Sequence, residues 1–451
     1  MKTKNLIWYF AVVVFFITTG CEKEALNPQT FDDYDLRTGI ENRALSHTKK
    51  YDAEVATAWY TLLADLSRYT FYFNPQSARI FAYSGLTLYE SVLPGMPSHQ
   101  SMFYQLSGQK ITFHGKPKDY YWPASANAAL AEIARKLIID YPQTPNLAAI
   151  NELEQEIYKN FQGKVNPEHL ENSVEFGKYV AEQIYQWSKS DGTITTCPPY
   201  IPLGNPENWV PTPPMFFPAA GACQGTLSTF IPEIAEKMMP PSPPQYSIDP
   251  ASEFYHMNLE VQQITQNLTS EQLIIIQAWR DIPNVNHNRP SQLFMITSNL
   301  IEKENINLED ASVLLAKQGF AIFDAIVSVF AAKFEHALLR PVTYIHNVIG
   351  DASWQSVYPA PQHPSYPATS TGVTAAVVEI LESYFGSNYA FEDSSQEELY
   401  GVFRYDSFSD MLEPAGISRT HSGINYELSV QVGEEMGRSV GEIVNNMDFQ
   451  K

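Results

Sequence analysis

Apolar residues recur at spacings of three and four along most of the chain, which is the pattern of one buried face of an α-helix. This pattern predicts helices at residues 53–69, 77–93, 124–139, 148–161, 172–188, 231–239, 251–268, 270–280, 291–301, 308–339, 373–385 and 426–446. No convincing run alternates apolar and polar residues as a strand does, although a short stretch such as 110–114 is long enough for local pairing. The chain is therefore predicted to be all-α.

Residues 196–246 interrupt the helical pattern with many prolines, which remove backbone donors and block helix interiors. We expect this segment to form a long excursion that connects an N-terminal helical half (51–195) to a C-terminal helical half (247–451). Its aromatic residues, which are Tyr200, Trp209, Phe216 and Phe217, are expected to pack on the helical body. The part of the chain after residue 50 is long enough for one large domain or two fused units.

The N-terminus has the pattern of a secretion signal. Two lysines precede an apolar run at 6–17, and small residues then lead to Cys21. The run is too short for a membrane-spanning helix, so residues 1–20 are predicted to be a signal peptide. Gly20 and Cys21 resemble a bacterial lipobox, which implies that Cys21 is lipidated; the alternative is a plain signal peptide with an incidental cysteine. Residues 21–50 are polar and irregular and predict a tether.

These features predict a location in the cell envelope, with a lipid anchor in the outer membrane and the body facing the periplasm or the surface. The formal charge is −21, and removing residues 1–20 deletes two lysines and no acid, which gives −23. Nucleic acids and anionic lipid headgroups need a basic partner surface, so we expect neither as a partner. We expect the protein to contact the membrane through its lipid anchor alone.

The remaining cysteines, Cys197 and Cys223, leave two possibilities open. A disulfide between them would close a loop of about 25 residues and contribute ~3 kcal/mol to stability. The alternative is two separate buried thiols. No histidine lies near either cysteine in the sequence, and no metal site is predicted.

The first candidate functional residues lie in segment 333–341. Lys333 and Arg340 are seven residues apart, so on a continuous helix that Pro341 ends they would lie on one face. The preceding residues 325–332 are nearly all apolar, which indicates that these cations emerge from a buried helix. Buried cations need an anion.

Two further segments supply groups that can bind the same anion. In residues 363–372, prolines stop at 367 and small hydroxyl residues open a helix, whose unpaired N–H groups can bind an anion; ordinary N-capping is the alternative. Residues 416–426 add Arg419 between two glycines. Two arginines, a lysine and a helix N-terminus can together bind a tetrahedral oxyanion.

The order of these motifs resembles the vanadium-dependent haloperoxidase and type 2 phosphatidic acid phosphatase superfamily. The resemblance rests on a lysine followed after six residues by Arg-Pro, then Tyr-Pro and small residues opening a helix, then Ser-Arg with a glycine four residues on. It covers most of residues 50–445, with 317–430 strongest and 208–214 also similar. It implies a helical-bundle fold with phosphate or vanadate held by Lys333, Arg340 and Arg419.

The chain departs from the family where catalysis would occur. Ser370 stands where the family has its acid/base histidine, and Thr369 where it has a glycine whose N–H contacts the oxyanion. Asn425 replaces the histidine that attacks phosphorus or ligates vanadium, and Ser429 replaces its acidic partner. An amide is no nucleophile and a serine hydroxyl does not titrate near neutral pH. The predicted oxyanion site comprises Lys333, Arg340, Thr369, Ser370, Arg419 and Asn425.

Three functions follow as alternatives. The first is a protein with degenerate catalysis that binds phosphate, sulfate, vanadate or a phosphorylated ligand. The second is an active phosphatase or haloperoxidase with relocated catalytic groups, for which His421 is the candidate substitute and His363 and His336 also lie close to the motifs. The third is a cell-surface scaffold whose pocket is vestigial.

Overall fold

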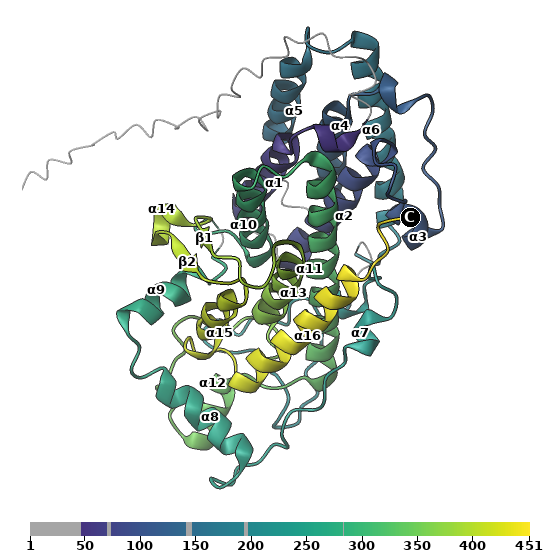
Figure 1. Cartoon of the computed structure of the whole chain (residues 1–451). Helices are drawn as coiled ribbons and strands as arrows, with labels where there is room; N and C mark the ends of the chain where they lie inside the picture. Colours follow the sequence, from purple (N-terminus) through teal and green to yellow (C-terminus); the bar gives the residue numbers. More distant parts are fainter. Residues whose placement is uncertain (1–46, 70–73, 141–146, 194–196, 283) are drawn as a thin grey trace, which may run out of the picture. The chain divides into compact units, whose positions relative to one another are not determined.

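The computed structural model describes residues 47–69, 74–140, 147–193, 197–282 and 284–451 (Figure 1). The predicted signal peptide, Cys21 and most of the predicted tether lie outside these residues. The packed body already includes the end of that tether, because Thr48, in a 3₁₀ helix at Thr48–Lys50, is buried and donates to the Val92 carbonyl at 2.8 Å.

The described chain is mostly helical, as the apolar periodicity predicts. The longer helices are α1 (Glu54–Tyr69), α2 (Asn74–Val92), α3 (Met102–Ser107), α4 (Trp122–Ile139), α5 (Leu147–Phe161), α6 (Pro167–Ser188), α8 (Glu253–Ile264), α9 (Ser270–Ala278), α10 (Arg289–Lys303), α11 (Leu308–His336), α13 (Thr369–Phe385), α15 (Leu412–Thr420) and α16 (Glu427–Asn445). Single helical turns form α7 (Ile234–Lys237), α12 (Pro341–Tyr344) and α14 (Glu397–Tyr400), and Ile345–Ile349 is a π-helical turn. Every predicted helix overlaps an observed one, whereas α3, α12, α14 and α15 were not predicted.

The strands of the described chain form one small antiparallel pair, β1 (Phe391–Asp393) and β2 (Phe403–Tyr405), with Glu392 opposite Arg404. The segment 110–114, where local pairing was considered, is irregular, so that expectation was wrong. The pair is short and does not change the all-α class.

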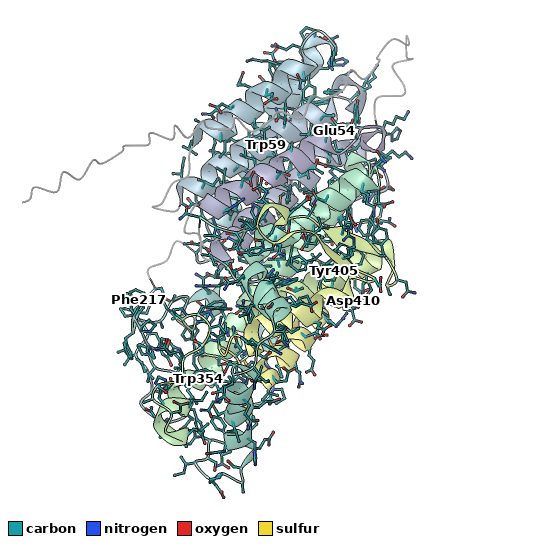
Figure 2. All side chains as sticks on the ribbon, turned by 90° about the vertical axis from the view of Figure 1, so that its left-hand side faces the viewer. Glu54, Trp59, Phe217, Trp354, Tyr405 and Asp410 are labelled. Carbon is teal, nitrogen blue, oxygen red and sulfur yellow. A yellow bond between two sulfur atoms is a disulfide. The ribbon has the colours of Figure 1, made fainter. Side chains whose placement is uncertain are left out.

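Helix α11 lies at the centre of the fold and packs against α2, α13 and α16 (Figure 1). It is long and apolar enough to cross a membrane, but 89% of its apolar window is buried inside the protein, as in a core helix. Its contact with α2 is close, since a Cβ on Gly319 would lie 2.7 Å from the Ala82 Cα. On the N-terminal side the core includes Trp59, labelled in Figure 2, whose indole donates to Asn127 at 2.8 Å. All of the described residues fall in a single compact unit, so the two helical halves are not separate domains.

Helices α13 and α16 pack backbone to backbone. A Cβ on Gly437 would lie 2.0 Å from the Gly372 carbonyl oxygen, and one on Gly433 would lie 2.4 Å from the Ala368 oxygen. Only glycine therefore allows this approach, which fixes the first turn of α13 against α16.

The chain turns sharply between Lys333 and Arg340, contrary to the predicted continuous helix. Helix α11 ends at His336, and Ala337 adopts a left-handed conformation with φ of 47°. Pro341 begins α12, where its fixed φ and missing N–H are tolerated at the first position, and Arg340 is the residue before it. The prediction that Lys333 and Arg340 share one helix face was therefore wrong.

The proline-rich segment packs along α11 and is tied to it by hydrogen bonds. The Trp209 N–H donates to the Ala337 carbonyl at 2.6 Å, and the buried carboxylate of Asp324 accepts the N–H groups of Phe230 and Ile231 at 2.9 and 2.8 Å. Cys197 and Cys223 form a disulfide.

The aromatic residues of this segment behave in two ways. Trp209 is buried and the Tyr200 ring lies 5.0 Å from that of Phe334, as expected. Phe216 and Phe217 are 61% and 46% exposed, so for these two the prediction of packing on the body was wrong.

Candidate active site

The Lys333 ammonium lies at the C-terminal end of α11 and is fully buried. It donates to the carbonyl of Pro364 at 2.8 Å, to that of Ser365 at 3.3 Å, and to that of Pro367. These acceptors match its three N–H bonds. Lys333 therefore holds the loop that leads into α13. It contributes positive charge to the site but has no N–H bond left to donate to a ligand.

Arg340 is also fully buried and connects two loops. Its Nε donates to the His363 carbonyl at 2.9 Å and its Nη1 to the Ile424 carbonyl at 2.7 Å. Its Nη2 lies 3.2 Å from Nδ1 of His363. A guanidinium has five N–H bonds, so two remain for a ligand.

Arg419 lies near the end of α15, the helix that the sequence analysis missed. Its Nε donates to the Ser418 hydroxyl at 3.0 Å and its Nη2 to the Trp279 carbonyl at 2.8 Å. No other hydrogen bond within the described ranges uses its remaining three N–H bonds. Arg419 is thus the cation with the most donors left for an anion.

A fourth buried cation, Arg289, was not predicted. Its Nη2 donates to the same Trp279 carbonyl as Arg419, at 2.6 Å, and its Nε lies 3.3 Å from the Ser370 hydroxyl. It opens α10 just before Pro290, as Arg340 stands just before the proline of α12. That shared Arg-Pro at a helix start was the available signal, but a residue at a helix start is usually exposed.

The first turn of α13 faces these cations. The residue before the helix, Ala368, offers no side-chain cap, so the opening N–H groups have no capping acceptor. The Thr369 hydroxyl is buried without a hydrogen-bond partner in the described chain. The Asn425 amide, by contrast, donates to the Ser365 carbonyl at 2.6 Å.

Lys333, Arg340 and Arg419 repel one another, and none of them forms an ion pair within the described residues, whereas Asp281 and Asp393 attract Arg289. Burial, together with the charges of Arg340 and Arg419, holds the pKa of Lys333 well below its ordinary value. Burial first and then Arg419 lower the pKa of Arg340 to about 9. Burial and the charges of Lys333 and Arg340 also lower the pKa of His363, so its ring is neutral at neutral pH. An anion in this site would relieve both the repulsion and the desolvation.

A cavity of about 500 Å³ joins these groups to the surface. All six predicted oxyanion-site residues line it, namely Lys333, Arg340, Thr369, Ser370, Arg419 and Asn425. His363 lines it as well, whereas His421 and His336 do not. His421 instead contacts Thr420 at 3.0 Å, and His336 contacts the Pro240 carbonyl at 3.1 Å. Within the described ranges, no group of three His, Cys, Asp or Glu side chains is placed to hold a metal ion.

Fold and site together define an all-α protein with a cationic pocket at a helix N-terminus. The family described as the VCPO second helical-bundle domain matches residues 313–450, a range that contains all six predicted site residues. The structure is similar to that of a bacterial vanadium-dependent iodoperoxidase, with a TM-score of 0.79 and 26% identity over 88% of this chain and 96% of that one.

Two structures of bacterial vanadium-dependent chloroperoxidase, in holo and apo form, match with TM-scores of 0.64 and 0.62 at 14% identity. They cover 83% and 82% of this chain and 92% and 93% of theirs. The sequence matches no curated protein significantly. The family match over residues 313–450 and the structural similarity support the vanadium haloperoxidase superfamily, which the motifs predict.

Proposed function

We propose that this protein is an envelope lipoprotein that binds phosphate, sulfate or a similar tetrahedral oxyanion and has lost the usual catalysis of its superfamily. One observation carries the proposal: Lys333, Arg340 and Arg419, none of which forms an ion pair within the described residues, line a cavity together with the unpartnered Thr369 hydroxyl, and Asp281 is the one carboxylate among the lining side chains. Since isolated buried charges are costly, a pocket of this kind is stable mainly when an anion occupies it. Arg340, Arg419 and Thr369 supply the free donors, and the opening turn of α13 adds its N–H groups.

The missing imidazoles argue against turnover. At position 425 the side chain is an amide whose Nδ2 is engaged by the Ser365 carbonyl and hydroxyl, at 2.6 and 3.2 Å. Position 370 carries a hydroxyl that accepts from Arg289. Vanadate would fit this pocket as an oxyanion held by cations, but the residues present offer no imidazole at these positions to bond its metal.

His363 is the imidazole that the structure brings to the cavity, and the protein contacts its Nδ1 from two sides. This nitrogen lies 3.2 Å from Nη2 of Arg340, which can only donate, and 3.3 Å from the Pro364 carbonyl, which can only accept, so these contacts do not select one tautomer. His363 is therefore the histidine on which the relocated-catalysis alternative rests.

Thermal unfolding with and without anions tests the proposal. A ligand at a hundred times its Kd stabilises the native state by about 2.7 kcal/mol, so millimolar phosphate, sulfate or vanadate should raise the Tm. Arg419→Ala should weaken binding roughly ten- to a hundredfold, because it removes charge-assisted hydrogen bonds of about 1.5–3 kcal/mol. Arg404→Ala, at an exposed position outside the cavity, is the matched control and should leave the shift unchanged.

The result that would contradict binding is a Tm insensitive to all three anions, which would leave the scaffold with a vestigial pocket. Degenerate catalysis is tested separately, by phosphate release from an aryl phosphate and by vanadate-dependent bromination of a dye. We expect neither reaction. Turnover that Arg419→Ala abolishes would overturn the proposal in favour of an active enzyme.

A further inference from the structure

The cavity is much larger than an inorganic oxyanion requires. Its volume of about 500 Å³ falls within the range of roughly 300–1,000 Å³ that is typical of sites for whole small molecules. A water molecule takes ~30 Å³ in the liquid, and a free phosphate is equivalent to only a few waters. Most of the space therefore lies beyond the anion.

Exposure distinguishes the two ends of the cavity. Lys333 and Arg340 are fully buried at one end, whereas Met215 and Phe217 are 62% and 46% exposed at the other (Figure 2 labels Phe217). The anion-binding groups thus form the floor, and the proline-rich segment forms part of the rim.

The rim is apolar along two segments. Residues 213–220 line the cavity with Pro213, Pro214, Met215, Phe217 and Ala220, and residues 358–361 line it with Tyr358, Pro359, Ala360 and Pro361. The Tyr358 hydroxyl donates to the Ser418 carbonyl at 3.1 Å, and the Arg280 guanidinium lies over its ring, 4.4 Å from the ring centroid, so Pro359, Ala360 and Pro361 supply the apolar surface of the second segment. Large apolar side chains that stay exposed at a cavity mouth mark a ligand contact.

Backbone hydrogen bonds hold this rim in place. The Ala220 N–H donates to the Gln362 carbonyl at 2.7 Å and joins the two apolar segments. The Phe216 N–H donates to the Thr212 carbonyl at 3.0 Å, which closes the turn before Phe217. The apolar wall is therefore formed before a ligand arrives, so binding need not order it.

We propose that the ligand is a tetrahedral oxyanion carried on a compact apolar group, such as an aryl monoester, rather than a free inorganic ion. The anionic group occupies the floor near Arg340 and Arg419, and the apolar group lies against Phe217 and Met215. This inference rests on the proposed oxyanion binding and adds the chemical class of the ligand.

Titration calorimetry with phenylphosphonate and methylphosphonate tests the inference, because both resist hydrolysis and differ in their apolar group. We expect phenylphosphonate to bind at least tenfold more tightly. Phe217→Ala should reduce this ratio to threefold or less while methylphosphonate binds as before. Ile201→Ala is the matched control, since Ile201 is 81% exposed on the same proline-rich segment but does not line the cavity; it should change neither affinity.

The outcomes separate this inference from the proposed function. Equal affinities for the two phosphonates, or a ratio that Phe217→Ala leaves unchanged, would overturn the apolar-group inference while methylphosphonate binding preserved the oxyanion site. Binding of neither phosphonate would overturn both. Since Phe217 is half exposed, its truncation is not expected to unfold the protein, and the unchanged methylphosphonate affinity verifies this.

Discussion

Replacing Gly437 with alanine should destabilise the protein through a clash between two helix backbones. The new Cβ would lie 2.0 Å from the Gly372 carbonyl oxygen and 2.8 Å from its carbonyl carbon, where ordinary contact begins at 3.4 Å. Neither helix can relieve this by rotating a side chain, so α13 and α16 must move apart.

The magnitude follows from two opposing terms. Overpacking typically costs 1–3 kcal/mol when side chains can adjust, and here the obstructing atom is backbone, so the cost lies at or above the top of that range. Alanine also gains about 1 kcal/mol over glycine in a helix interior. The net loss expected is about 2–4 kcal/mol in the free energy of unfolding.

Urea unfolding followed by circular dichroism measures this loss. The matched control is Gly416→Ala in α15, whose added Cβ would meet one flexible atom, Cγ1 of Val430 at 3.1 Å, and which should change stability by about 1 kcal/mol or less. Equal stability of the two variants would refute the argument from backbone contact. Because Gly433 and Gly437 seat the first turn of α13, Gly437→Ala should also reduce the Tm shift produced by anions.

Two further predictions concern the N-terminal half and the disulfide. Burial raises the pKa of Glu90 to about 7 even though it accepts from Ser101 and from the Phe103 N–H. Its contribution to stability is thus full below pH ~4.5 and is lost as pH rises through 7, a change of roughly 3 kcal/mol. In the Glu90→Gln variant, the free energy of unfolding measured in urea should fall between pH 5 and pH 8 by about that much less than in the wild type. A pH profile like that of the wild type would contradict this assignment. Replacing Cys197 and Cys223 together with serine should cost about 3 kcal/mol, since the bridge spans 26 residues, and a reductant should lower the Tm of the wild type but not of the double variant.

The helices were predictable because their apolar faces repeat over many residues, and α11 is the clearest case. The points at which helices end within an apolar run were not predictable, because they depend on tertiary contacts. Ala337 adopts its left-handed conformation where the chain meets Trp209, and no residue type there signals the turn. Short helices such as α15 were missed because one or two turns give too little periodicity.

The sequence predicted part of the cavity lining but not the contacts that its residues make. Charge spacing and the family resemblance identified six of the residues that line the cavity. They did not indicate that Lys333 is saturated by carbonyls or that Arg289 supports Ser370, because such bonds join segments far apart in the chain. Nor did they find the apolar rim, since Phe217 was expected to be covered.

The position of Asp324 has a consequence for how α11 reaches its place in the core. At 1.5 Å per residue the 29-residue helix is ~43 Å long, more than the ~30 Å of a bilayer's hydrocarbon core. A carboxylate near its middle would cost about 2.5–3.5 kcal/mol there, whereas in the folded body it accepts two backbone N–H groups from the proline-rich segment. Asp324 thus makes insertion of α11 into a lipid bilayer unfavourable and stabilises its burial within the protein.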